Sequence, residues 1–269
     1  MKPRDINVAA VQSQLFWEDR KANLHMFGEK FRTIEEPLDL LVLPEMFTTG
    51  FSMNAQKLAE PTDGPTLEWM RKHAASLNTV ITGSFIASED GNYYNRLLWV
   101  RPDGSYEQYD KRHLFRLAGE EKHFTPGTKK LIVELHGWKV CPLVCYDLRF
   151  PVWSRNRWTK EGDKLTSDYD LLLYVANWPE RRNIAWKTLL MARAIENLSY
   201  VIGLNRIGND ADNVLYTGDS AIIDFKGDPI KNAIISRDEI ISEILSVQLL
   251  AEFRKRFPAG MDGDEFNIL

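Results

Sequence analysis

The sequence predicts a single α/β domain in which strands and helices alternate in layers. The chain has 269 residues, and 44% of them are hydrophobic, which is enough for a large buried core. Short apolar runs of strand length alternate with longer segments that have helical periodicity. The order of these elements occurs twice along the chain, which predicts a doubled interior. In such layered folds the functional side chains lie at strand ends.

The first half of the chain contains two predicted helices and four predicted strands. Pro65 stands at the first position of the second helix, where proline is favoured. A polar turn, EDGN at residues 89–92, separates the last two strands and indicates a hairpin. The predicted elements are a strand at 6–11, a helix at 18–34, a strand at 40–43, a helix at 65–77 and strands at 79–87 and 94–100.

The second half of the chain repeats this order. Residues 39–45, a helix and the strand at 79–87 parallel residues 170–180, a helix and the strand at 200–205. Coincidence is the alternative to a true repeat. The predicted elements are strands at 132–135 and 140–144, a helix after Pro151, a strand at 171–175, a helix at 184–198, strands at 200–205, 221–225 and 240–247, and a helix at 249–256.

Charge and composition favour a non-exported protein. The formal net charge is -4, and basic and acidic residues are interspersed along the chain, so neither nucleic acid nor an anionic membrane is an expected partner. Residues 1–17 lack the uninterrupted apolar region of a secretion signal. The longest apolar run, residues 171–176, is too short to cross a bilayer. We therefore expect a cytoplasmic location.

The two cysteines, Cys141 and Cys145, are not expected to form a disulfide. In a strand, four residues span roughly 13 Å at about 3.3 Å per residue. A disulfide requires Cα atoms within about 7 Å of each other. Two free thiols fit the reducing environment of the cytoplasm.

Three reactive side chains stand beside apolar segments. Glu45 follows a buried strand; burial raises the pKa of a carboxylate, which suits a general base, although such a residue can also simply cap a strand. Cys145 lies where a strand meets a helix, and helix N–H groups there favour the thiolate; the alternative is a small core residue. Lys111 precedes an apolar pair and is either an oxyanion-stabilising ammonium or a solvated surface group.

Together these segments resemble the nitrilase superfamily of carbon–nitrogen hydrolases. The family places a Glu after a buried strand, a Lys in a second segment and a Cys at a strand-to-helix corner, in this order. The corresponding segments here are LPEMF at 43–47, YDKRHLF at 109–115 and VCYDLRFP at 144–151. The resemblance continues through YVANWP at 174–179, ARAIEN at 192–197 and YTGDS at 216–220, and extends from residue 6 to about residue 257.

The resemblance implies a fold, an assembly and an activity. The family fold is a four-layer α-β-β-α sandwich with a doubled strand and helix pattern, commonly paired into dimers through helices. We expect one carbon–nitrogen hydrolase domain over residues 1–269, with 258–269 as a C-terminal tail, in a homodimer or higher homo-oligomer. Residues 145–156 together with 175–179 look most like the ω-amidases, which hydrolyse the side-chain amide of 2-oxo acids such as 2-oxoglutaramate.

The resemblance also implies a mechanism that needs no metal and no organic cofactor. Glu45 takes the thiol proton of Cys145, and the sulfur attacks the amide carbonyl. Ammonia then leaves, and a thioester with Cys145 remains. Lys111 and the backbone N–H of Tyr146 stabilise the oxyanion. A second acid recurs shortly before a Pro-Gly turn; Glu120 is the better-aligned candidate here, and Glu121 is the alternative.

Substrate-binding residues are expected near the strand ends. Phe47 and Trp178 are candidates for the pocket wall, with ordinary packing as the alternative. An ω-amidase must bind a substrate carboxylate, for which an arginine fork is the usual group. Arg149 is the first candidate, with a structural salt bridge as the alternative, and Arg116 is a further one.

Other classes of protein compete with this interpretation. A zinc site could use Cys141 and Cys145 with some of His113, His123 and His136, but Pro142 separates the cysteines and no close histidine pair follows. A non-catalytic binding module is disfavoured because the Glu, Lys and Cys set is complete. Motifs of serine hydrolases, zinc proteases and phosphate-binding loops do not occur. Carbamoyl-amide hydrolysis, nitrile hydrolysis and amide transfer remain alternatives within the superfamily.

Overall fold

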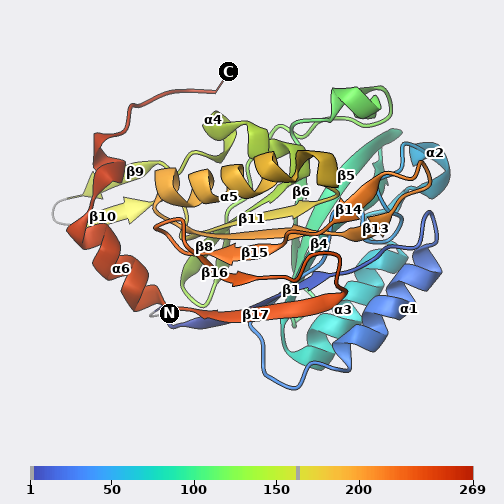
Figure 1. Cartoon of the computed structure of the whole chain (residues 1–269), viewed down its shortest axis with the longest axis horizontal. Helices are drawn as coiled ribbons and strands as arrows, with labels where there is room; N and C mark the ends of the chain where they lie inside the picture. Colours follow the sequence, from blue (N-terminus) through green and yellow to red (C-terminus); the bar gives the residue numbers. More distant parts are fainter. Residues whose placement is uncertain (1–2, 162–163, 269) are drawn as a thin grey trace.

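The computed structural model describes residues 3–161 and 164–268, and its strands form two large sheets (Figure 1). The first sheet has the order β17-β1-β2-β4-β5-β6, with the short β3 (Glu60–Pro61) beside β4. Its other strands are β1 (Ile6–Gln12), β2 (Leu40–Val42), β4 (Val80–Glu89), β5 (Asn92–Val100), β6 (Tyr106–Asp110) and β17 (Glu239–Leu245). The second has the order β16-β15-β12-β11-β8-β7. Its strands are β7 (Val133–Leu135), β8 (Trp138–Val144), β11 (Leu171–Ala176), β12 (Tyr200–Asn205), β15 (Ala221–Ile223) and β16 (Pro229–Asn232).

The two sheets share an internal plan, which confirms the repeat predicted from the sequence. In the first sheet β2 and β4 are parallel, with α3 (Pro65–Leu77) in their connection. In the second sheet β11 and β12 are parallel, with α5 (Asn183–Asn197) in theirs. The carbonyl of Asp39 accepts a hydrogen bond from Val80 N at 3.1 Å, and the carbonyl of Asp170 accepts one from Tyr200 N at 3.0 Å. The two halves therefore begin at equivalent positions.

The layers follow the predicted α-β-β-α order. Helices α1 (Arg20–Phe31) and α3 cover one face of the first sheet, α5 covers the outer face of the second, and the sheets pack on each other (Figure 1). Successive strand residues point to opposite faces. Val8 and Ala10 of β1 accordingly join the core between the sheets, whereas Ala9 and Val11 join the core under α1 and α3. Because both faces are buried, these strands have continuous apolar sequences.

Most predicted elements are confirmed with small shifts in their ends. Helix α3 begins at Pro65 as predicted, and α1 is shorter than predicted because Asp19 caps it by accepting a hydrogen bond from Ala22 N at 3.0 Å. The hairpin turn is tighter than predicted, because β4 and β5 extend to Glu89 and Asn92. The last helix, α6 (Val247–Arg256), starts two residues earlier than predicted.

The predicted helix after Pro151 is reduced to a single turn, α4 (Pro151–Ser154). The backbone N–H of Asn156 bonds to the side chain of Asn197 at 2.9 Å, so the chain leaves the helix instead of continuing it. A five-residue 3-10 helix, η3 (Cys145–Arg149), precedes α4. The nucleophile candidate thus stands at the start of a very short helix.

Several short elements were not predicted from the sequence, because their residues do not alternate between apolar and polar. Edge strands β6 and β16 are mostly polar, and all four residues of β16 are exposed. The other unpredicted elements are the short strand β3, the helix α2 (Ala55–Leu58), the strand pairs β9 (Trp158–Glu161) with β10 (Lys164–Ser167) and β13 (Ile207–Asn209) with β14 (Leu215–Thr217), and the 3-10 helices η1 (Arg116–Ala118), η2 (Glu120–Lys122), η3, η4 (Glu180–Arg182) and η5 (Ala259–Asp262).

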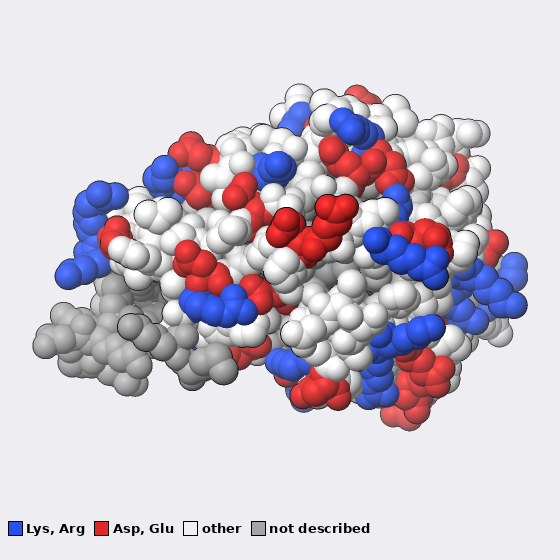
Figure 2. Space-filling view, turned by 90° about the horizontal axis from the view of Figure 1, so that it is seen from below, with Lys and Arg blue, Asp and Glu red and all other residues white. Residues whose placement is uncertain are grey.

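Charged side chains are mixed on the surface. On the described part of the face in Figure 2, basic and acidic residues are interspersed, as expected from the sequence. Within the residues that the structure describes, every helix is too short or too polar to span a bilayer.

Candidate active site

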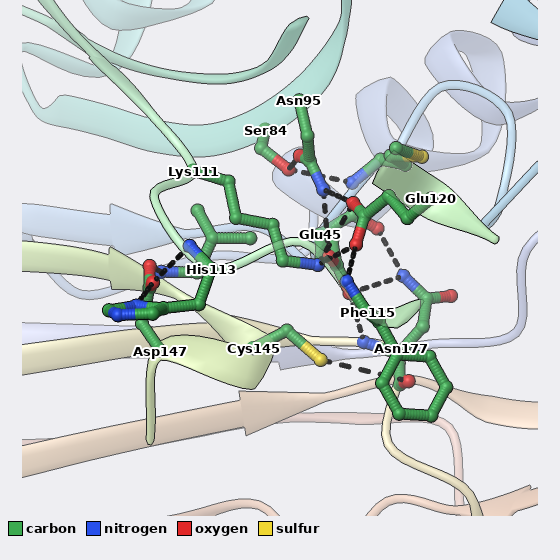
Figure 3. A network of polar contacts seen from close by, with 12 residues as sticks. Glu45, Ser84, Asn95, Lys111, His113, Phe115, Glu120, Cys145, Asp147 and Asn177 are labelled. Atoms are coloured by element: carbon green, nitrogen blue, oxygen red, sulfur yellow. Dashed lines mark hydrogen bonds and ion pairs between the residues drawn. The ribbon is translucent and has the colours of Figure 1, made fainter. Parts of the chain in front are cut away.

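The side chains of Glu45, Lys111 and Cys145 lie close together (Figure 3). Glu45 follows β2, Lys111 directly follows β6, and Cys145 directly follows β8 of the other sheet. The Nζ atom of Lys111 lies 2.8 Å from Oε1 of Glu45, and both side chains are fully buried. The fold therefore brings together three residues that are far apart in the sequence.

The Glu45 carboxylate is oriented by donors from both sheets. Nδ2 of Asn95, on β5, donates to Oε1 at 2.8 Å, and the backbone N–H of Asn177, just after β11, donates to Oε2 at 2.8 Å. The side chain of Asn177 also donates to the backbone carbonyl of Glu45 at 2.6 Å. These bonds leave the carboxylate little freedom to rotate.

Lys111 lies between two buried carboxylates. Its Nζ contacts the oxygens of Glu120 at 3.0 and 2.9 Å in addition to Glu45. Burial alone lowers the pKa of Lys111, but the charges of Glu120 and Glu45 outweigh it and raise the pKa above its usual value. Lys111 is therefore an ammonium ion at neutral pH.

Of the two neighbouring acids, Glu120 is the one that contacts Lys111. Its Oε2 also accepts a hydrogen bond from the backbone N–H of Phe115 at 2.6 Å. Burial raises the pKa of Glu120, Lys111 opposes this shift, and Glu45 adds to it. Glu121 is only partly buried, and its Oε2 has no hydrogen-bond partner among the described residues.

Cys145 occupies a strained corner. Its φ is 47°, a left-handed conformation that is uncommon for residues other than glycine and is often found at functional sites. Its Sγ lies 3.9 Å from the carbonyl oxygen of Asn177. The residue is buried, with 8% of its surface exposed.

The expectation that helix N–H groups favour the thiolate is wrong. Burial raises the pKa of Cys145 well above its usual value, the charge of Glu45 raises it further, and Lys111 only partly opposes these effects. These effects favour the thiol over the thiolate, so a neighbouring base has to accept the proton when the sulfur attacks.

A cavity of about 310 Å³ opens onto Cys145. Tyr146, Arg149 and Trp178 line it, as the sequence led us to expect for Arg149 and Trp178. The remaining lining residues are Trp17, Phe51, Met53, Phe115, Ala118, Asn177, Pro179, Arg181, Arg182, Asp210, Asp212, Val214 and Tyr216.

The expectation that Phe47 lines the pocket is wrong. Phe47 is fully buried in the core under α1 and α3, where its ring packs edge-to-face on Phe27 at 5.7 Å. The residues that follow a strand end can point to either side, and here the side chain points to the helix layer. Arg116 is exposed and lies outside the cavity wall.

Two further arginines, Arg181 and Arg182, lie on the cavity wall and were not predicted from the sequence. Burial and the neighbouring charge of Arg181 lower the pKa of Arg182. Within the described residues, neither these two nor Arg149 forms an ion pair with a carboxylate. The cavity wall carries these three guanidinium groups and two carboxylates, Asp210 and Asp212, and the excess of positive charge favours an anionic ligand. Their position directly after the strand-end motif at 174–179 was the only signal in the sequence.

Cys141 has no part in this site. It is free and fully buried in the core between the sheets, and burial raises its pKa to about 12. Within the described residues, the His, Cys, Asp and Glu side chains form no group of three or more that could hold a metal ion. The cysteine pair therefore gives no support to the zinc interpretation.

The chain is similar to known proteins over nearly its whole length. Residues 7–255 match the model of the carbon–nitrogen hydrolase family. The chain is 44% identical to the omega-amidase YafV of Escherichia coli (strain K12), over 98% of both chains. It is 34% identical to the 2-oxoglutaramate amidase of Bacillus subtilis (strain 168), over 82% of this chain and 83% of that one.

A solved structure is similar over nearly the whole fold. A CN-hydrolase superfamily protein from Xanthomonas campestris, crystallised with an arsenic adduct in its active site, superposes with a TM-score of 0.94. It shares 46% sequence identity, over 98% of this chain and 99% of that one.

Replacing Glu45 by Gln should lower the pKa of Cys145. The negative charge of Glu45 disfavours the thiolate, and the Lys111 charge that favours it remains. The thiolate of Glu45→Gln should therefore appear at lower pH than that of the unmodified chain, in a titration followed by ultraviolet thiolate absorbance. Each protein is referenced to its own Cys145→Ala version, which cancels the signal of Cys141. An unchanged or higher midpoint contradicts this account.

Proposed function

The chain belongs to the carbon–nitrogen hydrolase family, and we propose that it is an ω-amidase that cleaves the side-chain amide of a small 2-oxo acid. As a member of this family it is a hydrolase of carbon–nitrogen bonds other than peptide bonds. The observation that carries the proposal is a cysteine on a small cavity wall, with a buried Glu–Lys network behind it and unpaired arginines around it. The amidase relatives provide the substrate class.

In the first step Glu45 accepts the thiol proton of Cys145, and the sulfur forms a bond to the amide carbonyl carbon. The carbonyl oxygen becomes an oxyanion. The Lys111 ammonium and the backbone N–H of Tyr146, the next residue after the nucleophile, stabilise this charge. The raised pKa of Lys111 supports a fixed positive charge at this position.

In the second step the carbon–nitrogen bond breaks. Glu45 returns the proton to the leaving nitrogen, ammonia departs, and a thioester with Cys145 remains. Glu45 then takes a proton from a water molecule that attacks the thioester. The acid is released, and the proton returns to the sulfur of Cys145.

Glu120 acts in this proposal as a positioning residue for Lys111. It bonds to Nζ with both oxygens, and its Oε2 also accepts a hydrogen bond from the backbone N–H of Phe115. Without Glu120, a single carboxylate would hold the ammonium. The proposal therefore assigns proton transfer to Glu45 and orientation of the ammonium to Glu120.

The substrate carboxylate is assigned to the arginines. The ring of Trp178 lies 5.1 Å below the guanidinium carbon of Arg149, and the ring of Phe115 lies 5.0 Å from that of Arg182. Stacking on aromatic rings orients both guanidinium groups. A cavity of about 310 Å³ suits a small ligand. These features support a short acid with an amide at its far end.

A homodimer is proposed as the assembly, because α5 leaves apolar side chains in water. Ile184 and Ile195, which are 78% and 52% exposed, lie three turns apart on one face of the helix. Sedimentation velocity at micromolar concentration should give a dimer, and a monomer contradicts the proposal.

A cytoplasmic location is proposed from the two free cysteines.

Ammonia release from a panel of substrates tests the activity. The panel contains 2-oxoglutaramate, 2-oxosuccinamate, glutamine, asparagine, a carbamoyl amino acid and a simple nitrile. Release is expected from the 2-oxo acid amides alone, and Cys145→Ala should remain folded and release none. Cys141→Ala is the matched control: the same substitution in the core should lower stability by about 1 kcal/mol and retain activity.

Two results contradict the proposal. Activity in Cys145→Ala excludes this residue as the nucleophile. Silence of the unmodified chain on both 2-oxo acid amides overturns the ω-amidase assignment and leaves only the family.

Removing a guanidinium from the cavity should weaken binding of the substrate carboxylate. Arg182→Met and Arg149→Met should each raise KM for a 2-oxo acid amide by about tenfold or more, since a hydrogen bond to a charged group contributes about 1.5–3 kcal/mol. A neutral amide of the same length should show no such change. Arg116→Met, outside the cavity, is the control. An unchanged KM in both cavity variants contradicts the assignment.

A further inference from the structure

Asp147 is a fully buried carboxylate that makes four hydrogen bonds, and the reaction steps above do not use it. Its Oδ2 accepts from Oη of Tyr109 at 2.7 Å and from the backbone N–H of Val144 at 3.1 Å. Its Oδ1 contacts His113 twice, at the backbone N–H at 3.0 Å and at ring Nδ1 at 2.7 Å. Each carboxylate oxygen thus has two partners.

The surrounding donors fix the direction of these bonds. Trp153 Nε1 lies 3.0 Å from the Tyr109 oxygen, and an indole N–H can only donate. The Tyr109 oxygen therefore accepts from Trp153 and uses its own proton for Asp147. Burial and the charge of Asp147 raise the pKa of Tyr109 well above its usual value, which keeps this proton in place. The ring of His113 is stacked on the ring of Phe150, with 3.8 Å between the ring centroids and the two rings nearly parallel.

The partners of Asp147 flank the two reactive residues along the chain. Tyr109 and His113 stand two residues before and two residues after Lys111. Val144 immediately precedes Cys145, and Asp147 itself follows Cys145 by two residues. In Figure 3, His113 and Asp147 lie on one side of Lys111, and Glu45 and Glu120 lie on the other. One carboxylate therefore joins the Lys111 segment of the first sheet to the corner of the second sheet that carries Cys145.

We propose that Asp147 is a positioning residue that sets the spacing between the Lys111 ammonium and the Cys145 sulfur. This role rests on the proposed function, in which the ammonium stabilises the oxyanion formed at the sulfur. The strained φ of Cys145 needs such support, because a residue in a sparsely populated conformation keeps it only when its surroundings hold it. The bonds to Val144 and to the Lys111 segment supply that support from both sides.

The structure explains why an isosteric amide cannot replace this carboxylate. One oxygen faces the backbone N–H of His113, and the other faces that of Val144. Both backbone N–H groups can only donate a hydrogen bond. In either orientation, the NH₂ group of an asparagine would face one of these N–H donors, so the contact with either His113 or Val144 must break.

The test combines steady-state kinetics with the pH profile of Cys145 alkylation by iodoacetamide, followed by peptide mass spectrometry. In Asp147→Asn, kcat should fall by about 100-fold, because a misplacement of catalytic groups by about 1 Å can lower the rate by about this factor. KM should change by less than about threefold. The alkylation midpoint should move to higher pH, because Lys111, which favours the thiolate, is no longer held near the sulfur. A purely structural loss lowers the folded fraction and leaves that midpoint unchanged.

Two further variants keep the test decisive. Tyr109→Phe removes a single O–H and should shift both readouts in the same direction, with kcat lower by about tenfold. Asp170→Asn is the matched control: Asp170 accepts from Lys139 N at 3.0 Å at the opposite end of β11, so stability should fall while kcat and the alkylation midpoint stay unchanged.

Wild-type kcat and an unchanged alkylation midpoint in Asp147→Asn overturn the proposal. If Asp147→Asn does not fold, the same two results in Tyr109→Phe overturn it. The alkylation assay needs no substrate. A chain that is inactive on 2-oxo acid amides therefore refutes the ω-amidase function, whereas the alkylation midpoints still decide the role of Asp147.

Discussion

The Lys111 ammonium, enclosed by the carboxylates of Glu45 and Glu120, is the interaction on which the rest of the site depends. A buried ammonium is stable only with close counter-charges, and a buried carboxylate has the same need. The three groups therefore have to be buried together, although each comes from a different segment. Their arrangement provides a fixed positive charge beside the sulfur and a carboxylate that can accept its proton. The charges of Glu45 and Glu120 also disfavour the thiolate of Cys145, so that proton transfer accompanies the attack on the substrate.

The doubled architecture explains how such a site forms. Two sheets built on the same plan pack face to face, and strand ends from both reach the same edge of the sandwich. Asn177 from the second sheet orients Glu45 of the first, and Asp147 from the second holds the segment that carries Lys111. The chemistry therefore lies across the interface of the sheets, and the pairing of the two halves determines its geometry. The arginines that surround the cavity come from the segment after β11 and from η3, which places charge recognition next to the nucleophile.

The sequence predicted the elements with strong apolar patterns and the residues that interrupt them. Long strands such as β4 and helices such as α3 were recognisable, because burial on one or both faces imposes a periodic pattern. Glu45, Lys111 and Cys145 were recognisable because a reactive group stands next to an apolar segment. Edge strands β6 and β16 were not, since their residues are largely polar. The orientation of Phe47 and the state of the Cys145 thiol depend on three-dimensional packing and on charges from distant segments. Asn95 gave no signal, because an asparagine inside a strand has the same local pattern whether it bonds to a carboxylate or to water.

The central claim is that the amide is cleaved through a thioester on Cys145, and partitioning with hydroxylamine tests it most directly. The substrates are the amide and the methyl ester of the dicarboxylic acid that lacks the 2-oxo group, because hydroxylamine would convert a ketone to an oxime. Each is given to the enzyme with a fixed concentration of hydroxylamine, and the hydroxamate and free acid are measured. Because both substrates pass through one acyl-enzyme, the account predicts the same ratio of hydroxamate to acid from each. A ratio that depends on the leaving group, or no hydroxamate from either substrate, would contradict it.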